Sequence, residues 1–115
     1  MSRIAVIGGG PGGMMAAVAA VDKGHQVDLF DSNEKLGKKL YITGKGRCNL
    51  TNAVDIGDYF DSIVHNHSFM YSALYSYTNV DFMAFIEKNG VPLKTERGDR
   101  VFPVSDKSSD VINAF

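Results

Sequence analysis

Hydrophobic and polar positions change their spacing along this chain, and each change marks a boundary between predicted elements. Residues 3–8 form a β-branched apolar run ended by glycine, which is typical of a strand buried on both faces. The alanine- and methionine-rich stretch 14–23 predicts a helix, with Pro11 in its first turn and Gly24 just beyond its end. The apolar run 26–31 predicts a second strand. The chain therefore begins with a β-α-β unit.

The pattern becomes mixed after the second strand. Residues 32–46 indicate mostly loop, with a short apolar piece inside it. Residues 68–77 place apolar side chains on one helical face. Thr78 and Asp81 form a capping box that predicts a further helix, which Gly90 closes.

The last third of the chain predicts a β-hairpin and the beginning of a helix. Residues 93–96 and 100–102 flank Arg97-Gly98-Asp99, a sequence typical of a hairpin turn. Serines then precede Val111 and Ile112, which indicates a helix start. A parallel sheet needs more strands and helices than these, so we expect the fold to be incomplete without downstream sequence.

These elements predict an α/β fold, with a Rossmann-like β-α-β unit followed by a helical stretch and a β-hairpin. We divide the chain at residue 53. Residues 1–53 would hold the β-α-β unit and a loop close to a cofactor. Residues 54–115 would hold the helical stretch, the hairpin and the start of the last helix, as part of a longer protein.

Charge and cysteine content narrow the classes of function. Lys and Arg total 12 against 13 Asp and Glu, so we expect neither nucleic acid nor a membrane surface as partner. The apolar run before the glycines is too short for a signal peptide or a membrane span, and we expect a cytoplasmic protein. Cys48 is the single cysteine, which excludes a dithiol mechanism within this segment.

The spacing Gly8-x-Gly10-x-x-Gly13 is the main candidate for chemistry. It follows a predicted strand and precedes a predicted helix, as in dinucleotide-binding folds. Gly8 permits the tight turn, Gly10 lets the backbone approach a pyrophosphate, and Gly13 allows close packing of helix on strand. Phosphates would lie on the unpaired N–H groups that begin the helix, so Pro11 and Gly12 belong to the same candidate site.

Asp31 lies at the end of the second predicted strand, eighteen positions after Gly13. A carboxylate there can accept hydrogen bonds from ribose hydroxyls, and it disfavours the 2′-phosphate of NADP. The alternative is a solvated acid in a turn.

Residues 35–52 favour FAD over NAD as the ligand. This stretch holds several cations, glycines and hydrogen-bonding side chains, and it is much longer than a simple connection between a strand and a helix. A simple NAD-binding dehydrogenase domain would not need it.

The same stretch resembles the signature of the BaiN / aminoacetone-oxidase family of FAD-dependent oxidoreductases. The similarity rests on Gly-Lys-Lys-Leu at 37–40, Thr-Gly-Lys-Gly-Arg-Cys-Asn-Leu-Thr-Asn at 43–52 and Val-Phe-Pro-Val-Ser-Asp-Lys at 101–107. It implies a larger enzyme whose FAD domain is interrupted by a substrate domain, with hydride or electron transfer between a small organic molecule and FAD. NAD(P)H is a candidate electron donor. Where this sequence has Asp31, the family usually has Glu.

The resemblance also implies which residues line the ribityl chain and flavin: Lys39, Thr43, Gly46, Arg47, Cys48 and Asn49. Two of them have alternatives from their residue type alone. Arg47 is either a direct cofactor contact or a structural salt bridge. Cys48, without a partner cysteine, favours the role of a small packing residue. No catalytic residue can be named.

Other interpretations stay open at this point. The chain can be a non-catalytic, truncated dinucleotide-binding module, or part of an NAD-binding dehydrogenase. We expect the isolated chain to lack turnover. His65 and His67 are not accompanied by further ligands at suitable spacing, so we predict no metal site. The sequence does not indicate the substrate or the oligomeric state.

Overall fold

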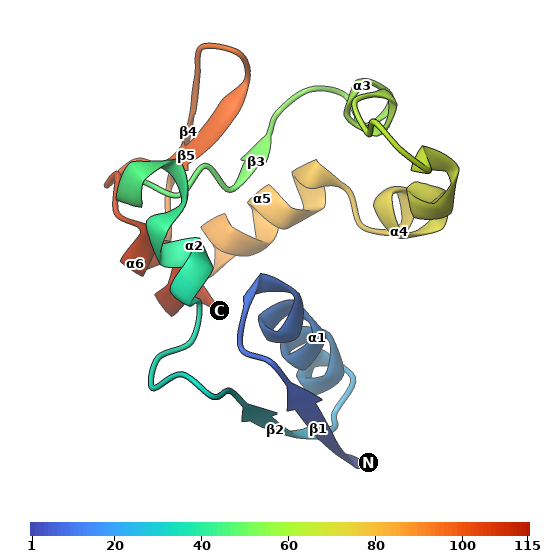
Figure 1. Cartoon of the computed structure of the whole chain (residues 1–115), viewed down its shortest axis with the longest axis vertical. Helices are drawn as coiled ribbons and strands as arrows, with labels where there is room; N and C mark the ends of the chain where they lie inside the picture. The colour runs from blue at the N-terminus through green and yellow to red at the C-terminus, as the bar shows by residue number, and fades with distance from the viewer.

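The parallel β-α-β unit lies beside a mixed region built on an antiparallel sheet (Figure 1). The computed structural model describes all residues, Met1–Phe115. The unit consists of β1 (Arg3–Ile7), α1 (Pro11–Asp22) and β2 (Gln26–Phe30), and its strands pair in parallel register. The predicted Rossmann-like unit is confirmed, with Pro11 beginning the helix.

Two glycines shape this unit. Gly24 follows α1 with a φ of +81°, a left-handed conformation that glycine adopts without steric cost. A Cβ atom at Gly13 would collide with the carbonyl oxygen of Gly8, so α1 packs on the end of β1 only because Gly13 has no side chain. Both roles were predicted from the sequence.

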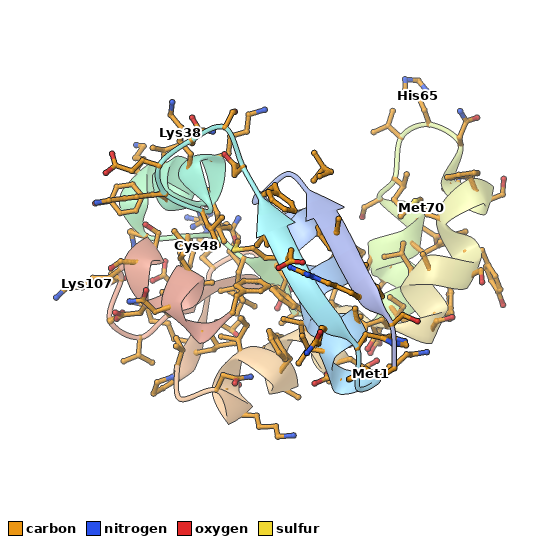
Figure 2. All side chains as sticks on the ribbon, turned by 90° about the horizontal axis from the view of Figure 1, so that it is seen from below. Met1, Lys38, Cys48, His65, Met70 and Lys107 are labelled. Atoms are coloured by element: carbon orange, nitrogen blue, oxygen red, sulfur yellow. The ribbon has the colours of Figure 1, made fainter.

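The prediction that the first strand is buried on both faces is wrong. Alternate residues of β1 are exposed, and Ile7 keeps 80% of its surface accessible. The physical reason is that α1 covers one face of the two-stranded sheet and nothing covers the other. In Figure 2 no helix lies in front of the two strands.

The segment after β2 is more ordered than predicted. It forms α2 (Lys38–Ile42) and the short 3₁₀ helix η1 (Thr43–Gly46), where the sequence indicated mostly loop. Gly37 adopts a φ of +71° at the start of α2, and its N–H donates to the carbonyl of Gly9 at 2.8 Å. α2 has only five residues, and of these Leu40 packs against the core. Such a short helix shows no hydrophobic period in the sequence.

The predicted hairpin is confirmed and gains a third strand. β4 (Leu93–Glu96) and β5 (Arg100–Pro103) are antiparallel, and β3 (Thr51–Asn52) pairs with the other edge of β5. β3 was missed because two residues carry no alternating pattern. This pairing joins residues from both sides of the predicted division at residue 53. The division itself stays a prediction.

Five helical segments complete the chain: α3 (Ile56–Asp61), η2 (His67–Met70), α4 (Tyr71–Ser76), α5 (Asn79–Lys88) and α6 (Ser108–Ala114). The helix predicted over 68–77 is divided into the 3₁₀ helix η2 and α4, and α3 was not predicted. At α5 both hydrogen bonds of the predicted capping box between Thr78 and Asp81 are present. No helix is long and apolar enough to cross a bilayer.

The central core lies between α5, α6 and the antiparallel sheet. Its fully covered members include Cys48, Ile86 and Val111, and aromatic rings of α5 pack against Phe115. Cys48 has no exposed surface and packs within this core, and its burial raises the pKa of the thiol. The segment that carries Cys48 is thus anchored in the core.

We expect Gly13→Ala to lower the free energy of unfolding by about 1–3 kcal/mol, because the new methyl group forces α1 away from β1. Gly12→Ala is the matched control, since a Cβ there meets open space and alanine favours the helix. Urea unfolding of the full-length protein measures both. Equal stability of the two variants would contradict the close packing at Gly13.

Candidate functional site

The turn between β1 and α1 presents main-chain donors without acceptors. Gly8 donates to the carbonyl of Phe30 at 2.7 Å and Gly9 donates to Asp31, whereas the N–H groups of Gly10, Gly12 and Gly13 make no hydrogen bond within the chain. They lie at the positive end of the α1 dipole. Such an arrangement favours an anion, above all a phosphate.

The surroundings of these amides leave room for a ligand. A Cβ atom at Gly10 or Gly12 would meet nothing within 4 Å. At Gly9, in contrast, a Cβ would meet Cδ2 of Leu36, so the Leu36 side chain would have to move to admit it. Leu36 therefore covers Gly9 and leaves the next part of the turn open. The glycines fit a pyrophosphate, because a backbone without side chains can approach it closely.

Asp31 lies directly beside this turn. Its carboxylate accepts hydrogen bonds from the N–H of Asn33 at 2.6 Å and from the N–H of Gly9 at 2.7 Å. These two bonds hold the pKa of the Asp31 carboxyl below its ordinary value, and the bond from Asn33 has the larger effect. Each carboxylate oxygen still has a lone pair for a further donor, such as a ribose hydroxyl.

The second group of predicted residues lies on α2, η1 and the segment after them. Lys39 is exposed on α2, and the Thr43 hydroxyl donates to the carbonyl of Leu40 at 2.7 Å. Gly46 has a φ of +86° and open space around its Cα, and Asn49 is exposed. Lys39 and Asn49 are thus exposed with side chains that make no hydrogen bond within the chain, and Gly46 has open space beside it.

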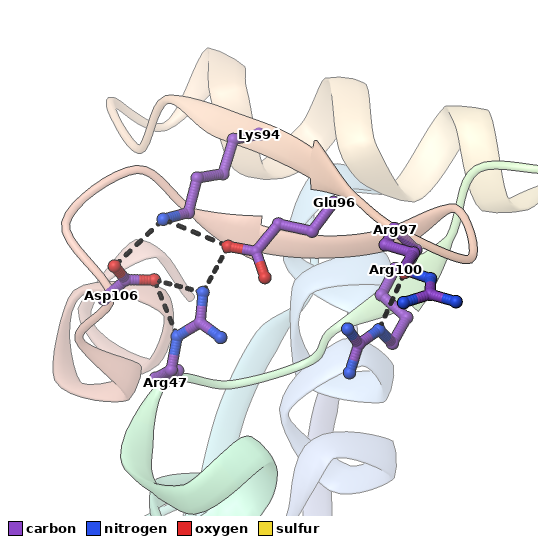
Figure 3. Close-up of polar contacts among 6 residues, drawn as sticks. All are labelled: Arg47, Lys94, Glu96, Arg97, Arg100 and Asp106. Carbon is purple, nitrogen blue, oxygen red and sulfur yellow. Dashed lines mark hydrogen bonds and ion pairs between the residues drawn. The ribbon is translucent and has the colours of Figure 1, made fainter.

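Arg47 contacts two carboxylates and an aromatic ring, while its Nη1 has no partner and its side chain is 34% exposed (Figure 3). Its guanidinium pairs with Glu96 of β4 and donates through Nε to Asp106 at 2.9 Å. It also stacks on the ring of Phe102, with 4.1 Å between Cζ and the ring centroid. The structural salt bridge, one of the two roles that the sequence left open, is present.

A buried amide anchors the other end of this segment. Asn79, at the start of α5, donates through Nδ2 to the carbonyls of Asn52 and Val54, both at 2.7 Å. Sequence reasoning missed Asn79, because asparagine at the first turn of a helix is common. It also missed Glu96, whereas Asp106 lies within the 101–107 block on which the resemblance rests.

The structure brings the predicted residues together in two separate groups. Gly8–Gly13 and Asp31 form the first, and Thr43–Asn49 with its ionic partners forms the second. No hydrogen bond or ion pair joins a member of one group to a member of the other. The bond from Gly37 to Gly9 connects the two regions of the chain.

Comparison with known proteins identifies the family. The family described as HI0933-like protein Rossmann domain matches residues 2–115. This chain belongs to that family. It is 36% identical to a 3-dehydro-bile acid delta(4,6)-reductase of Clostridium scindens over 97% of this chain and 27% of that protein. It is 38% identical to a ribosomal RNA dihydrouridine synthase of Escherichia coli over 75% of this chain and 21% of that protein.

The chain spans about a quarter of the length of these two relatives. A shorter match, 48% identical over 35% of the chain, is to an NADH oxidase of Thermoanaerobacter brockii. The chain is therefore a dinucleotide-binding Rossmann segment of a family with oxidoreductase members. The expected BaiN-type membership is confirmed.

The Asp31 hydrogen bonds predict a dependence of stability on pH. Because the pKa of Asp31 is lowered in the folded state, its contribution is complete above the ordinary carboxyl value of about 4 and is lost as pH falls through the lowered value. Wild type should thus unfold at a higher temperature than Asp31→Asn at pH 7, and this difference should shrink below about pH 4. Thermal unfolding across pH measures it.

Glu34→Gln is the matched control for this measurement, because Glu34 is an exposed acid in the same connection. It should unfold like the wild type at every pH. A difference between wild type and Asp31→Asn that stays constant down to pH 2 would contradict the role given to the carboxylate.

Proposed function

We propose that this segment binds the adenosine diphosphate half of FAD in a flavin-dependent oxidoreductase. The observation that carries the proposal is the set of unpaired amides at Gly10, Gly12 and Gly13, together with the open space beside Gly10 and Gly12. Those N–H groups would donate to the pyrophosphate. The nearby Asp31 carboxylate would accept from the adenosine ribose.

The charge of Asp31 supports a ligand with a free 2′-hydroxyl. An ionised carboxylate repels a 2′-phosphate, and the hydrogen bonds from Asn33 and Gly9 keep Asp31 ionised at neutral pH. This favours FAD or NAD over NADP at this site. If NAD(P)H is the electron donor, it would bind at a site other than the glycine turn.

Two observations favour FAD over NAD. The connection that follows β2 folds into α2 and η1 and is anchored in the core through Cys48. It is therefore an ordered part of the fold that can line a cofactor. The chain also belongs to a family with oxidoreductase members, and the resemblance of residues 37–52 is to FAD-dependent enzymes. We propose that Gly46 and Asn49 approach the cofactor beyond its pyrophosphate.

In this function the chain binds and orients FAD, and FAD supplies the group that accepts and donates hydride. The amides of the glycine turn offset the pyrophosphate charge without a side chain having to move. The Asp31 carboxylate fixes the ribose and so the direction in which the rest of the cofactor extends. Cys48 takes no part, because its thiol is buried and burial raises its pKa. A small organic substrate and a cytoplasmic location complete the proposal.

Gly10→Ala tests the cofactor site in the full-length protein. Its φ of −77° suits alanine and a Cβ there meets no protein atom, so the fold should be unchanged. The methyl group would occupy the space of the pyrophosphate and weaken FAD binding about 10-fold or more, which is about 1.4 kcal/mol. Fluorescence titration of the apoprotein with FAD measures the affinity.

Gly57→Ala is the matched control, because a Cβ there also meets open space but lies on α3. It should bind FAD as the wild type does. Full-length wild type should also purify with the yellow colour of bound flavin. A colourless protein that does not take up added FAD, or one in which NAD competes with FAD at equal affinity, would contradict the proposal.

A further inference from the structure

Four charged side chains form a closed network on one side of the antiparallel sheet (Figure 3). Arg47 and Lys94 are the cations, and Glu96 and Asp106 are the anions. Each cation contacts both anions: Lys94 lies 2.9 Å from Asp106 and 3.3 Å from Glu96. The network is neutral, with no charge left over for a ligand.

The network joins three separate parts of the chain. Arg47 follows η1, Lys94 and Glu96 lie on β4, and Asp106 lies in the turn between β5 and α6. The carboxylates are acceptors for the guanidinium through two of its nitrogens, Nε to Asp106 and Nη2 to both acids. This geometry uses the fork of arginine, which lysine cannot reproduce.

The backbone next to Arg47 is in a conformation that needs support. Lys45 and Cys48 have φ values of +57° and +60°, in the left-handed region that residues with side chains rarely adopt. Such residues persist when their surroundings hold them in place. Cys48 is held from inside by the core, and Arg47, its neighbour, is held from outside by the network and by the Phe102 ring.

We infer that Arg47 is a positioning residue and not a contact of the cofactor: with Glu96, Asp106 and Lys94 it clamps the Thr43–Asn49 segment onto the antiparallel sheet. The inference rests on the proposed function, because the clamped segment is the one proposed to approach FAD. Because the two carboxylates occupy Nε and Nη2, a phosphate could bind the guanidinium through two nitrogens only by displacing a carboxylate, and Nη1 alone is free. The clamp thus acts on the cofactor through the shape of the segment.

The two roles of Arg47 predict opposite effects of removing its partners. If Arg47 contacts an anionic cofactor directly, then Glu96→Gln and Asp106→Asn free its charge and FAD binds as well or more tightly. If Arg47 is a clamp, both variants loosen the segment and weaken FAD binding about 3-fold to 10-fold. The clamp also predicts that Arg47→Met adds little further loss once Glu96→Gln is present.

Arg47→Lys separates charge from geometry. A direct phosphate contact tolerates lysine as a point charge. The clamp requires the fork and the stacking on Phe102, so Arg47→Lys should resemble Arg47→Met in FAD affinity. Asp99→Asn is the matched control, because it removes one negative charge from the same hairpin outside the network and should leave FAD affinity unchanged.

Hydrogen exchange tests the clamp without the cofactor. The Cys48 N–H donates to the carbonyl of Thr43 at 3.0 Å, and the Leu50 N–H donates to that of Val101 at 3.0 Å. In the full-length apoprotein both amides should exchange about 5-fold or more faster in Glu96→Gln and Asp106→Asn than in wild type or Asp99→Asn. The same acceleration should appear in Arg47→Met.

These readouts keep the two proposals distinct. Faster exchange at Cys48 together with weaker FAD binding in the acid variants supports the clamp. Unchanged exchange in all three variants, or tighter FAD binding in Glu96→Gln, would overturn it. If wild type does not bind FAD at all, the proposed function fails, and the exchange rates alone still decide whether Arg47 clamps the segment.

Discussion

The proposed cofactor site depends on main-chain N–H groups that have no acceptor inside the chain. Those of Gly10, Gly12 and Gly13 lie at the start of α1, with open space beside Gly10 and Gly12. They have no acceptor because no helical turn precedes them, and the packing of Gly13 against the carbonyl of Gly8 fixes α1 directly behind the glycine turn. The hydrogen bond from Gly9 to Asp31 then places a carboxylate at the edge of the same space. Close packing of helix on strand thus produces an anion site next to a hydroxyl acceptor.

The segment that follows Gly37 is held in place next to the glycine turn by the rest of the chain. The segment that follows Gly37 is not a free connection, because the core holds Cys48, an amide holds its far end through Asn79, and ion pairs hold Arg47. Three independent anchors give a segment with left-handed residues one conformation. The two-stranded parallel sheet, in contrast, keeps one face uncovered, with Ile7 exposed upon it.

Sequence reasoning found those parts of the structure that depend on local rules. Gly13, Gly24 and the Thr78 capping box act as their residue types predict, because each works through the backbone of its own turn. It missed β3, α2 and the partners of Arg47. A two-residue strand and a one-turn helix have no period to detect, and ion pairs between residues about fifty positions apart depend on the tertiary fold. Asp31 was correctly placed beside the glycine turn, but its bond to Gly9 has no local signature.

The most direct test of the central claim is a titration of ¹⁵N-glycine-labelled apoprotein with ADP, followed by two-dimensional NMR. If the unpaired amides bind the pyrophosphate, the Gly10, Gly12 and Gly13 signals shift with ADP and saturate together, while those of Gly90 and Gly98 stay in place. A spectrum in which the three turn glycines do not move, or move no more than Gly90 and Gly98, would contradict the account.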